Sequence, residues 1–230
     1  MTDVKYLPNG PIDSIFDFDR EACRVRRELN WGLAAFTVVF EPDGQVLLVQ
    51  LGDYCRDRYQ GNPWTIPGGA VEWSEKPSQA AVREVEEESG IRLDPSLLRP
   101  AAWFPRPYYE SYRGTKGELL LLFAEFGNAG DPRIRPRPPE TLGAMFHPFD
   151  LQSWLEVPDC GTGSHMLQPL PKHFTYWVNI GHQALLNQFT PPFVHTYENK
   201  EEMRVQPWTD KLSEQIPFGP DHLRVQGVKS

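Results

Sequence analysis

Three glutamates that lie close together in the sequence have the chemistry and the spacing of a metal site. Glu84, Glu87 and Glu88 stand at i, i+3 and i+4, so in a helix, which turns by about 100° per residue, they project from one face. Carboxylate oxygens are hard ligands that suit Mg²⁺ or Mn²⁺, and either ion keeps coordination positions open for a substrate phosphate. The spacing therefore predicts a divalent-metal site that acts on a phosphate-containing substrate.

The position of these glutamates argues for a site, although most charge runs are simply solvated faces. They crowd the last two turns of the expected helix, where the helix dipole disfavours anions by about 0.3–1 kcal/mol each. Like charges at i, i+4 add further repulsion. A bound divalent cation would relieve it, and Arg83 is the basic residue among them. Glu86 lies near the edge of the apolar sector and is assigned no primary role.

Two glycines stand just ahead of the helical segment. The pair Gly68-Gly69 allows the backbone to turn sharply and to approach a ligand without intervening side chains. A backbone carbonyl at this place could complete a metal shell. Most Gly-Gly pairs are only turns, so the pair has weight only beside the glutamates.

The helix that would carry the glutamates is delimited by local signals. Pro77 suits its first turn, and Gly90 stands where a left-handed C-terminal cap is expected. Val82, Val85 and Ser89 fall on a face roughly opposite to the glutamates, and this face would pack against a sheet.

Apolar runs elsewhere predict the strands of that sheet. The runs 31–40 and 45–51 flank the turn signal 41–44 and are expected to form a hairpin. Further extended segments are predicted at 65–67, 97–104, 118–126 and 142–146. The order of elements predicts a mixed sheet flanked by helices, in the α/β or α+β class.

The two flanks are less informative. We expect an N-terminal extension over residues 1–30, a central domain over 31–155 and a C-terminal extension over 156–230. A short helix is expected at 151–155. Residues 172–189 have helical spacing of apolar residues and are expected to pack back onto the core, whereas 190–230 is rich in proline and has no assignable function.

Composition excludes several classes of protein. The chain has 230 residues, a net charge of −8 and an ordinary globular content of 40% hydrophobic residues, which argues against a broad nucleic-acid or anionic-membrane surface. Its three cysteines are odd in number and far apart, unlike a disulfide framework or a zinc site. The sequence shows neither a signal pattern nor a membrane span, so a cytoplasmic location is the default expectation.

The stretch from Gly69 to Ile91 resembles the Nudix box, G-x5-E-x7-R-E-U-x-E-E-x-G-U, in which U is a bulky aliphatic residue. Every defined position of the box is matched, by Gly69, Glu75, Arg83, Glu84, Val85, Glu87, Glu88, Gly90 and Ile91. The resemblance implies an α/β/α sandwich that hydrolyses a nucleoside diphosphate linked to another group, with Mg²⁺ or Mn²⁺ as the cofactor.

The resemblance also implies roles for particular residues. Glu84, Glu87 and Glu88 would coordinate the metals together with the carbonyl of Gly68, and Arg83 would orient the carboxylates. Glu75 would be structural or would touch the site. Many members use a further acid from a later loop, for which Glu140 is the candidate. The general base varies within the family, so Glu84, Glu88 and Glu140 all remain open for that role.

The substrate is less sharply indicated. Three aromatic residues, Trp64, Trp103 and Tyr109, are candidates to stack on a base, and core packing is the alternative for each. Members of this family that act on nucleotide sugars, such as ADP-ribose pyrophosphatases, carry a proline at a typical distance after the box, and Pro107 matches it. Members that act on dinucleoside polyphosphates carry a tyrosine slightly later, and Tyr109 matches it. A small-molecule nucleotide sugar is favoured over a nucleoside triphosphate.

Two other kinds of protein share this resemblance. Some relatives are nucleotide-sensing regulators with a DNA-binding module, but the tail here lacks a basic recognition-helix pattern, and no nucleic-acid partner is expected. An isomerase acting on a prenyl diphosphate would need a reactive cysteine, for which Cys55 is the candidate. No membrane partner is expected, and the two flanks are natural places for homodimer contacts.

Overall fold

The computed structural model describes residues 5–52, 64–110, 114–126, 134–135, 140–149, 172–186, 193–197, 203–207 and 216–217. The helices are α1 (Ile15–Leu29), α3 (Pro77–Ser89) and α5 (Lys172–Leu186). The strands are β1 (Gly32–Phe40), β2 (Gln45–Leu51), β3 (Trp64–Thr65), β4 (Gly68–Ala70), β5 (Arg99–Glu110), β6 (Lys116–Phe126), β7 (Thr141–Pro148), β8 (Phe193–Tyr197), β9 (Met203–Pro207) and β10 (Ile216–Pro217).

The strands form one mixed sheet whose centre is the pair β1 and β6. These two strands run parallel in register from Gly32 opposite Glu118 to Phe40 opposite Phe126. The strand order is β10-β9-β8-β5-β6-β1-β2-β3, with β4 paired to β1 and β7 paired to β2. Strands β8 to β10, which the sequence did not predict, extend the sheet beyond β5.

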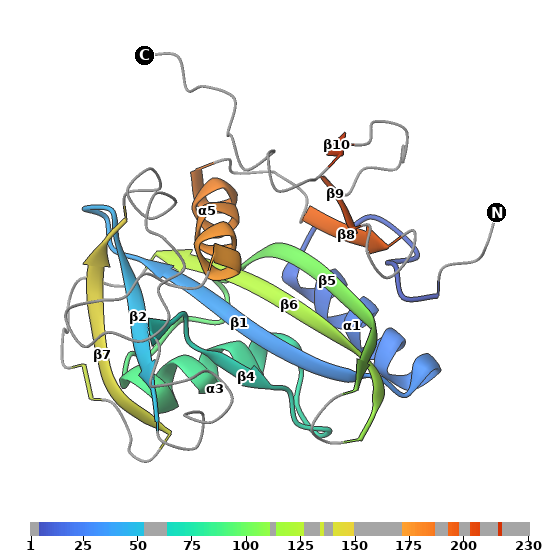
Figure 1. Ribbon diagram of the computed structural model, residues 1–230, viewed down its shortest axis with the longest axis horizontal. Coiled ribbons are helices and arrows are strands. Elements are labelled where there is room, and N and C mark those ends of the chain that lie inside the picture. Colours follow the sequence, from blue (N-terminus) through green and yellow to red (C-terminus); the bar gives the residue numbers. More distant parts are fainter. Residues whose placement is uncertain are drawn as a thin grey trace.

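Alternation along β6 sends its side chains into two separate cores. Leu119, Leu121 and Phe123 enter a cluster that also contains residues of α1 and α3, whereas Leu120 and Leu122 enter a second cluster with residues of α5. Figure 1 shows α1 and α3 on one side of the sheet and α5 on the other. The predicted α/β/α sandwich with a mixed sheet is therefore confirmed.

The expected hairpin is only partly formed. Its turn is present, with the N–H of Gly44 donating to the carbonyl of Glu41. Strands β1 and β2 pair at a single position, Phe40 opposite Val46, and then separate. β1 continues alongside β6 and β4, while β2 continues alongside β7 and β3.

Helix α1 lies in the segment for which the sequence was interpreted only as an extension. Ser14 caps its N-terminus by accepting the N–H of Asp17, and Asn30 ends it with a left-handed backbone. Phe18, Ala22 and Val25 lie on one face, and none of them is exposed to solvent. The first 30 residues thus contribute a helix to the core.

Helix α5 confirms the expected helix in the tail, although it ends at Leu186. Its residues Val178, Ile180 and Leu185 are buried against the sheet. The short helix expected at 151–155 lies outside the described residues. In the part of the chain that is described, no helix is long and apolar enough to cross a membrane.

Candidate active site on helix α3

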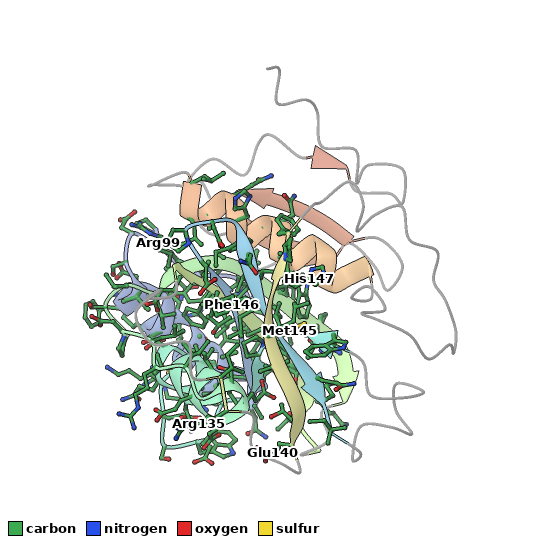
Figure 2. All side chains as sticks on the ribbon, turned by 90° about the vertical axis from the view of Figure 1, so that its left-hand side faces the viewer. Arg99, Arg135, Glu140, Met145, Phe146 and His147 are labelled. Atoms are coloured by element: carbon green, nitrogen blue, oxygen red, sulfur yellow. The ribbon has the colours of Figure 1, made fainter. Side chains whose placement is uncertain are left out.

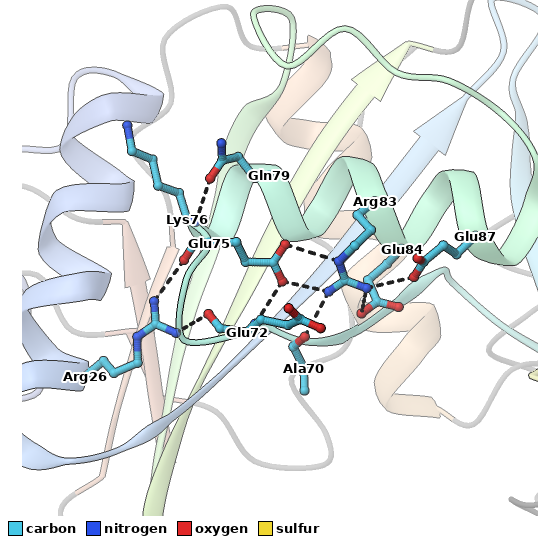
Figure 3. A network of polar contacts seen from close by, with 9 residues as sticks. All are labelled: Arg26, Ala70, Glu72, Glu75, Lys76, Gln79, Arg83, Glu84 and Glu87. Atoms are coloured by element: carbon cyan, nitrogen blue, oxygen red, sulfur yellow. Dashed lines mark hydrogen bonds and ion pairs between the residues drawn. The ribbon is translucent and has the colours of Figure 1, made fainter.

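Arg83 is the centre of the polar network on α3. Its guanidinium contacts Glu75 with two nitrogens, at 2.7 and 3.2 Å, and it reaches Glu84 at 2.9 Å and Glu87 at 2.8 Å. A further bond of 3.2 Å runs to the carbonyl of Ala70. Figure 3 shows one side chain joining three carboxylates and a strand. A planar cation with five donors is the side chain best suited to this arrangement.

Glu75 contacts Arg83 and a neighbouring backbone group. The N–H of Glu72 donates to its Oε1 at 2.8 Å. Burial raises the pKa of Glu75, but the hydrogen bonds from Arg83 and from the N–H of Glu72, together with the Arg83 charge, outweigh it and bring the pKa below its usual value. Of the two roles open for Glu75, these contacts correspond to the structural one.

The two glycines bring the backbone of β4 against the glutamates of α3. The N–H of Gly68 donates to Oε2 of Glu88 at 2.9 Å. A Cβ at Gly69 would lie 2.7 Å from Oε1 of Glu84, so only glycine leaves room for that carboxylate. A Cβ at Gly68 would lie 2.5 Å from the carbonyl oxygen of Ala35, on the paired strand β1.

Burial and mutual repulsion make ionisation of the glutamates unfavourable. Burial raises the pKa of Glu84 to about 7, against the lowering effect of Arg83 and with a further increase from the charges of Glu87 and Glu140. Burial likewise raises the pKa of Glu88 to about 8, assisted by the charges of Glu84, Glu140 and Glu87. The charges of Glu84, Glu87, Glu88 and Glu140 would therefore repel one another, and a divalent cation would relieve this repulsion.

Glu140 comes from a different element and reaches the same field. It immediately precedes β7, so that Glu140 and His147 lie at the two different ends of this strand (Figure 2). Its carbonyl accepts the N–H of Gly52 at 2.8 Å, and the next residue, Thr141, donates its hydroxyl to the carbonyl of Glu88 at 3.0 Å. The backbone around Glu140 is thus fixed both to β2 and to the end of α3.

The sequence matches a known protein family over the region that contains this site. The sequence model of the NUDIX domain matches residues 31–159, more than half of the 230 residues. The chain belongs to the NUDIX family. The resemblance noted from the box is confirmed.

Two curated relatives and one solved structure illustrate the range of the similarity. An RNA pyrophosphohydrolase from Bartonella henselae is 30% identical over 130 residues, which are 52% of this chain and 73% of that protein. Diphosphoinositol polyphosphate phosphohydrolase 2 from Mus musculus is 36% identical over 89 residues, which are 39% of this chain and 41% of that protein. The NUDIX domain of Shewanella oneidensis NrtR, complexed with ADP ribose, is 16% identical with a TM-score of 0.48, and the match covers 80% of this chain and 99% of that one. The chain spans less than half the length of the second relative. By family it is a NUDIX pyrophosphohydrolase.

The NUDIX glutamates fit a divalent cation in charge and in ligand type. Glu84, Glu87 and Glu88 supply carboxylate oxygens, and among the described residues Glu84 and Glu87 form ion pairs with the guanidinium of Arg83. Among the described residues no three carboxylate, imidazole or thiolate side chains are grouped closely enough to hold an ion, because Glu84 and Glu87 are turned toward Arg83. The fit therefore rests on the donor chemistry of the cluster.

One of the three aromatic candidates, Trp103, lies in the hydrophobic core. Trp103 has no exposed surface, and its indole N–H donates to the carbonyl of Tyr6 at 3.0 Å. Its predicted contact with substrate is wrong, because its ring packs edge-on against Phe18 of α1 inside the core. Trp64 is half-buried on β3. The side chain of Tyr109 and the whole of Cys55 lie outside the described residues.

Two residues of α1 that contact the NUDIX box were not predicted. Arg26 donates to the carbonyls of Glu72 and Glu75, and Asp19 accepts from Ser78 at the start of α3. In the sequence, the apolar residues of 15–29 have helical spacing, and Asp19 and Arg26 stand seven positions apart among them. This spacing predicts a helix. It does not predict the contacts, because they join residues 46 to 59 positions apart.

Proposed function

We propose that the chain hydrolyses a diphosphate linkage with Mg²⁺ or Mn²⁺ held by Glu84, Glu87, Glu88 and the carbonyl of Gly68. The observation that carries the proposal is that α3 places Glu84 and Glu87 in contact with Arg83 and Glu88 in contact with the N–H of Gly68 on β4. A bound cation would stabilise the ionised form of carboxylates that burial and mutual repulsion disfavour, and oxygen ligands favour a hard cation.

The side chains have distinct parts in this proposal. A bound divalent cation would neutralise the diphosphate oxygens and increase the acidity of a water molecule. Arg83 restricts the rotamers of Glu84 and Glu87 through its contacts of 2.9 and 2.8 Å. The carboxylate that accepts the proton of the attacking water is one of Glu84, Glu88 and Glu140.

We propose a nucleoside diphosphate derivative as the substrate, a nucleotide sugar such as ADP-ribose being the favoured form. Trp64, which is half-buried beside the second core cluster, is a candidate to stack on the base. Nucleoside triphosphates and dinucleoside polyphosphates are the alternatives. The similarity to an RNA pyrophosphohydrolase over 73% of its length adds a diphosphate linkage in RNA as a second candidate.

The test is product release with Mg²⁺ or Mn²⁺ across a panel of compounds. The panel contains nucleotide sugars, dinucleoside polyphosphates, nucleoside triphosphates, a 5′-triphosphorylated oligonucleotide and prenyl diphosphates. Glu87→Gln is the loss variant. Glu86→Gln is its matched control, because Glu86 is on the same helix but pairs with Arg92 at 2.9 Å.

The proposal predicts metal-dependent turnover of a nucleotide sugar that is lost in Glu87→Gln and kept in Glu86→Gln. Turnover of triphosphates or of the oligonucleotide alone would replace the substrate class and leave the hydrolase in place. Nucleotide binding without turnover of any compound would favour a sensor.

Light scattering on the same sample tests the homodimer contacts that the sequence suggests at the two flanks.

A further inference from the structure

Helix α1 holds the loop of the NUDIX box through the side chain of Arg26. This side chain is buried, with 6% of its surface exposed. One terminal nitrogen donates to the carbonyl of Glu72 at 2.7 Å, and the other donates to the carbonyl of Glu75 at 3.0 Å. The guanidinium also lies 5.3 Å from the ring centre of Trp73, within the range of a cation–π contact. Two hydrogen bonds and one cation–π contact from a single side chain thus hold one short loop.

A second anchor joins α1 to the start of the helix that carries the glutamates. The carboxylate of Asp19 accepts the N–H of Ser78 at 2.9 Å and its hydroxyl at 2.6 Å. Lys76, at the N-cap position of α3, has no side-chain oxygen to accept these N–H groups. Asp19 therefore supplies from another helix the capping carboxylate that the local sequence lacks.

The two anchors have a fixed spacing. Asp19 and Arg26 are seven residues apart, which is two helical turns and about 10.5 Å along one face of α1. Between them Ala22 and Val25 are completely buried against the sheet. The segment from Glu72 to Ser78 is consequently fixed at both of its ends to a helix that belongs to the core.

A continuous series of contacts leads from Arg26 to the glutamates of the site. Arg26 holds the carbonyl of Glu75, the carboxylate of Glu75 holds two nitrogens of Arg83, and Arg83 contacts Glu84 and Glu87. Figure 3 shows this series in one view, from α1 on one side to the end of α3 on the other. A movement of the Glu75 backbone would therefore move the carboxylate that orients Arg83.

We propose that Arg26 is a positioning residue for catalysis, acting through Glu75 and Arg83 on the metal-binding carboxylates Glu84 and Glu87. The inference rests on the proposed metal-dependent function. A purely structural Arg26 would add to the stability of the fold and would leave the site unchanged. The two roles differ in whether metal affinity and turnover fall further than the loss of stability requires.

The experiment compares Arg26→Ala and Arg26→Lys with Val25→Ala in the full chain. Val25 neighbours Arg26 on α1, is completely buried and has an aliphatic side chain that cannot hydrogen-bond the box, so its truncation destabilises α1 without releasing the loop. For each protein, the melting temperature, the affinity for Mn²⁺, kcat and KM are measured. Hydrogen exchange of the amides in 70–76 reports the loop directly, because the N–H of Glu72 is bonded to Glu75.

The proposal predicts that Arg26→Ala lowers kcat by about ten- to a hundredfold, the loss typical of a small misplacement of catalytic groups, with a smaller change in KM. Mn²⁺ affinity falls and exchange in 70–76 becomes faster. Arg26→Lys, whose ammonium keeps the charge but lacks the fork that spans two carbonyls, recovers part of each loss. Val25→Ala lowers the melting temperature and leaves Mn²⁺ affinity, kcat and loop exchange at wild-type values.

Wild-type kcat, Mn²⁺ affinity and loop exchange in Arg26→Ala would overturn the inference, and so would equal losses in Val25→Ala. If the wild-type chain neither binds Mn²⁺ nor turns over any substrate, the proposed function fails. Positioning for catalysis then falls with it, and the exchange data still decide whether Arg26 holds the loop.

Discussion

The buried carboxylate of Glu88 accepts the backbone N–H of Gly68 at 2.9 Å. This bond connects the last turn of α3 to strand β4 across 20 residues of sequence. The bond uses one carboxylate oxygen of Glu88, and the charges of Glu84, Glu87 and Glu140 raise the pKa of this carboxyl group. The relationship explains why a glycine precedes the box, since the backbone must approach the carboxylate where a Cβ would collide with β1.

Glu88→Gln is predicted to abolish most metal-dependent turnover without unfolding the protein. The amide oxygen of glutamine can still accept the N–H of Gly68, while the ionised ligand is lost. Because burial and the neighbouring carboxylates raise the pKa of Glu88 to about 8, a neutral amide replaces a side chain that is already mostly neutral near pH 7, and the melting temperature stays at or above the wild-type value. Turnover and thermal unfolding measured on one preparation check both parts. A folded variant with full activity would remove Glu88 from the metal site.

Gly69→Ala is predicted to lower activity through Glu84 alone. The added Cβ would lie 2.7 Å from Oε1 of Glu84, so that carboxylate must shift from its present position beside Arg83. We expect a fall in kcat and in Mn²⁺ affinity with little change in the melting temperature. Gly10→Ala is the matched control, because nothing lies within 4 Å of its Cβ position. Equal behaviour of the two variants would contradict the close approach.

Arg83→Lys is predicted to weaken metal binding by roughly 10- to 100-fold, as is usual when a group that orients metal ligands is replaced. A single ammonium cannot bridge Glu75, Glu84 and Glu87 as the guanidinium does. Calorimetric titration with Mn²⁺ measures the effect. Arg92→Lys, which alters an exposed pair with Glu86, should keep the wild-type affinity.

Glu125→Gln is predicted to stabilise the protein at alkaline pH. Burial raises the pKa of Glu125 from 4.5 to about 7, with a weak opposing bond from the N–H of Asp94, and its Oε2 is buried without a hydrogen-bond partner. The folded state therefore binds a proton that the unfolded state has lost, so wild-type stability decreases as the pH rises from about 4.5 to about 7.

Melting curves of wild type and Glu125→Gln should nearly coincide at pH 5 and diverge by pH 8, with the variant more stable. Glu86→Gln removes a surface carboxylate and serves as the control. A constant difference between Glu125→Gln and wild type at every pH would show that the carboxyl is ionised in the same way in both states.

Local patterns in the sequence predicted the parts of the site that depend on local structure. The spacing of Glu84, Glu87 and Glu88 fixes their common face once a helix forms, and Pro77 and Gly90 mark its ends in the structure as they do in the sequence. Strand β2 follows its apolar run from Gln45 to Leu51 without a shift.

Features that depend on tertiary contacts were missed. Trp103 lies in a strand that is covered on both faces, by α1 and by α5, so proximity to the box in sequence could not tell which face its ring occupies. Asp19 and Arg26 looked like ordinary charges of a terminal segment. Their acceptors and donors, at Ser78, Glu72 and Glu75, become neighbours only after α1 packs on the sheet.

The most direct test of the account is the initial rate of diphosphate cleavage as a function of free Mg²⁺, for wild type and for a variant with Glu84, Glu87 and Glu88 all changed to Gln. We predict no turnover by wild type in excess chelator, recovery as Mg²⁺ is added back, and no recovery by the variant at any concentration. Cleavage that persists in chelator, or that Mg²⁺ restores equally to the variant, would contradict the assignment of these three glutamates as the metal site.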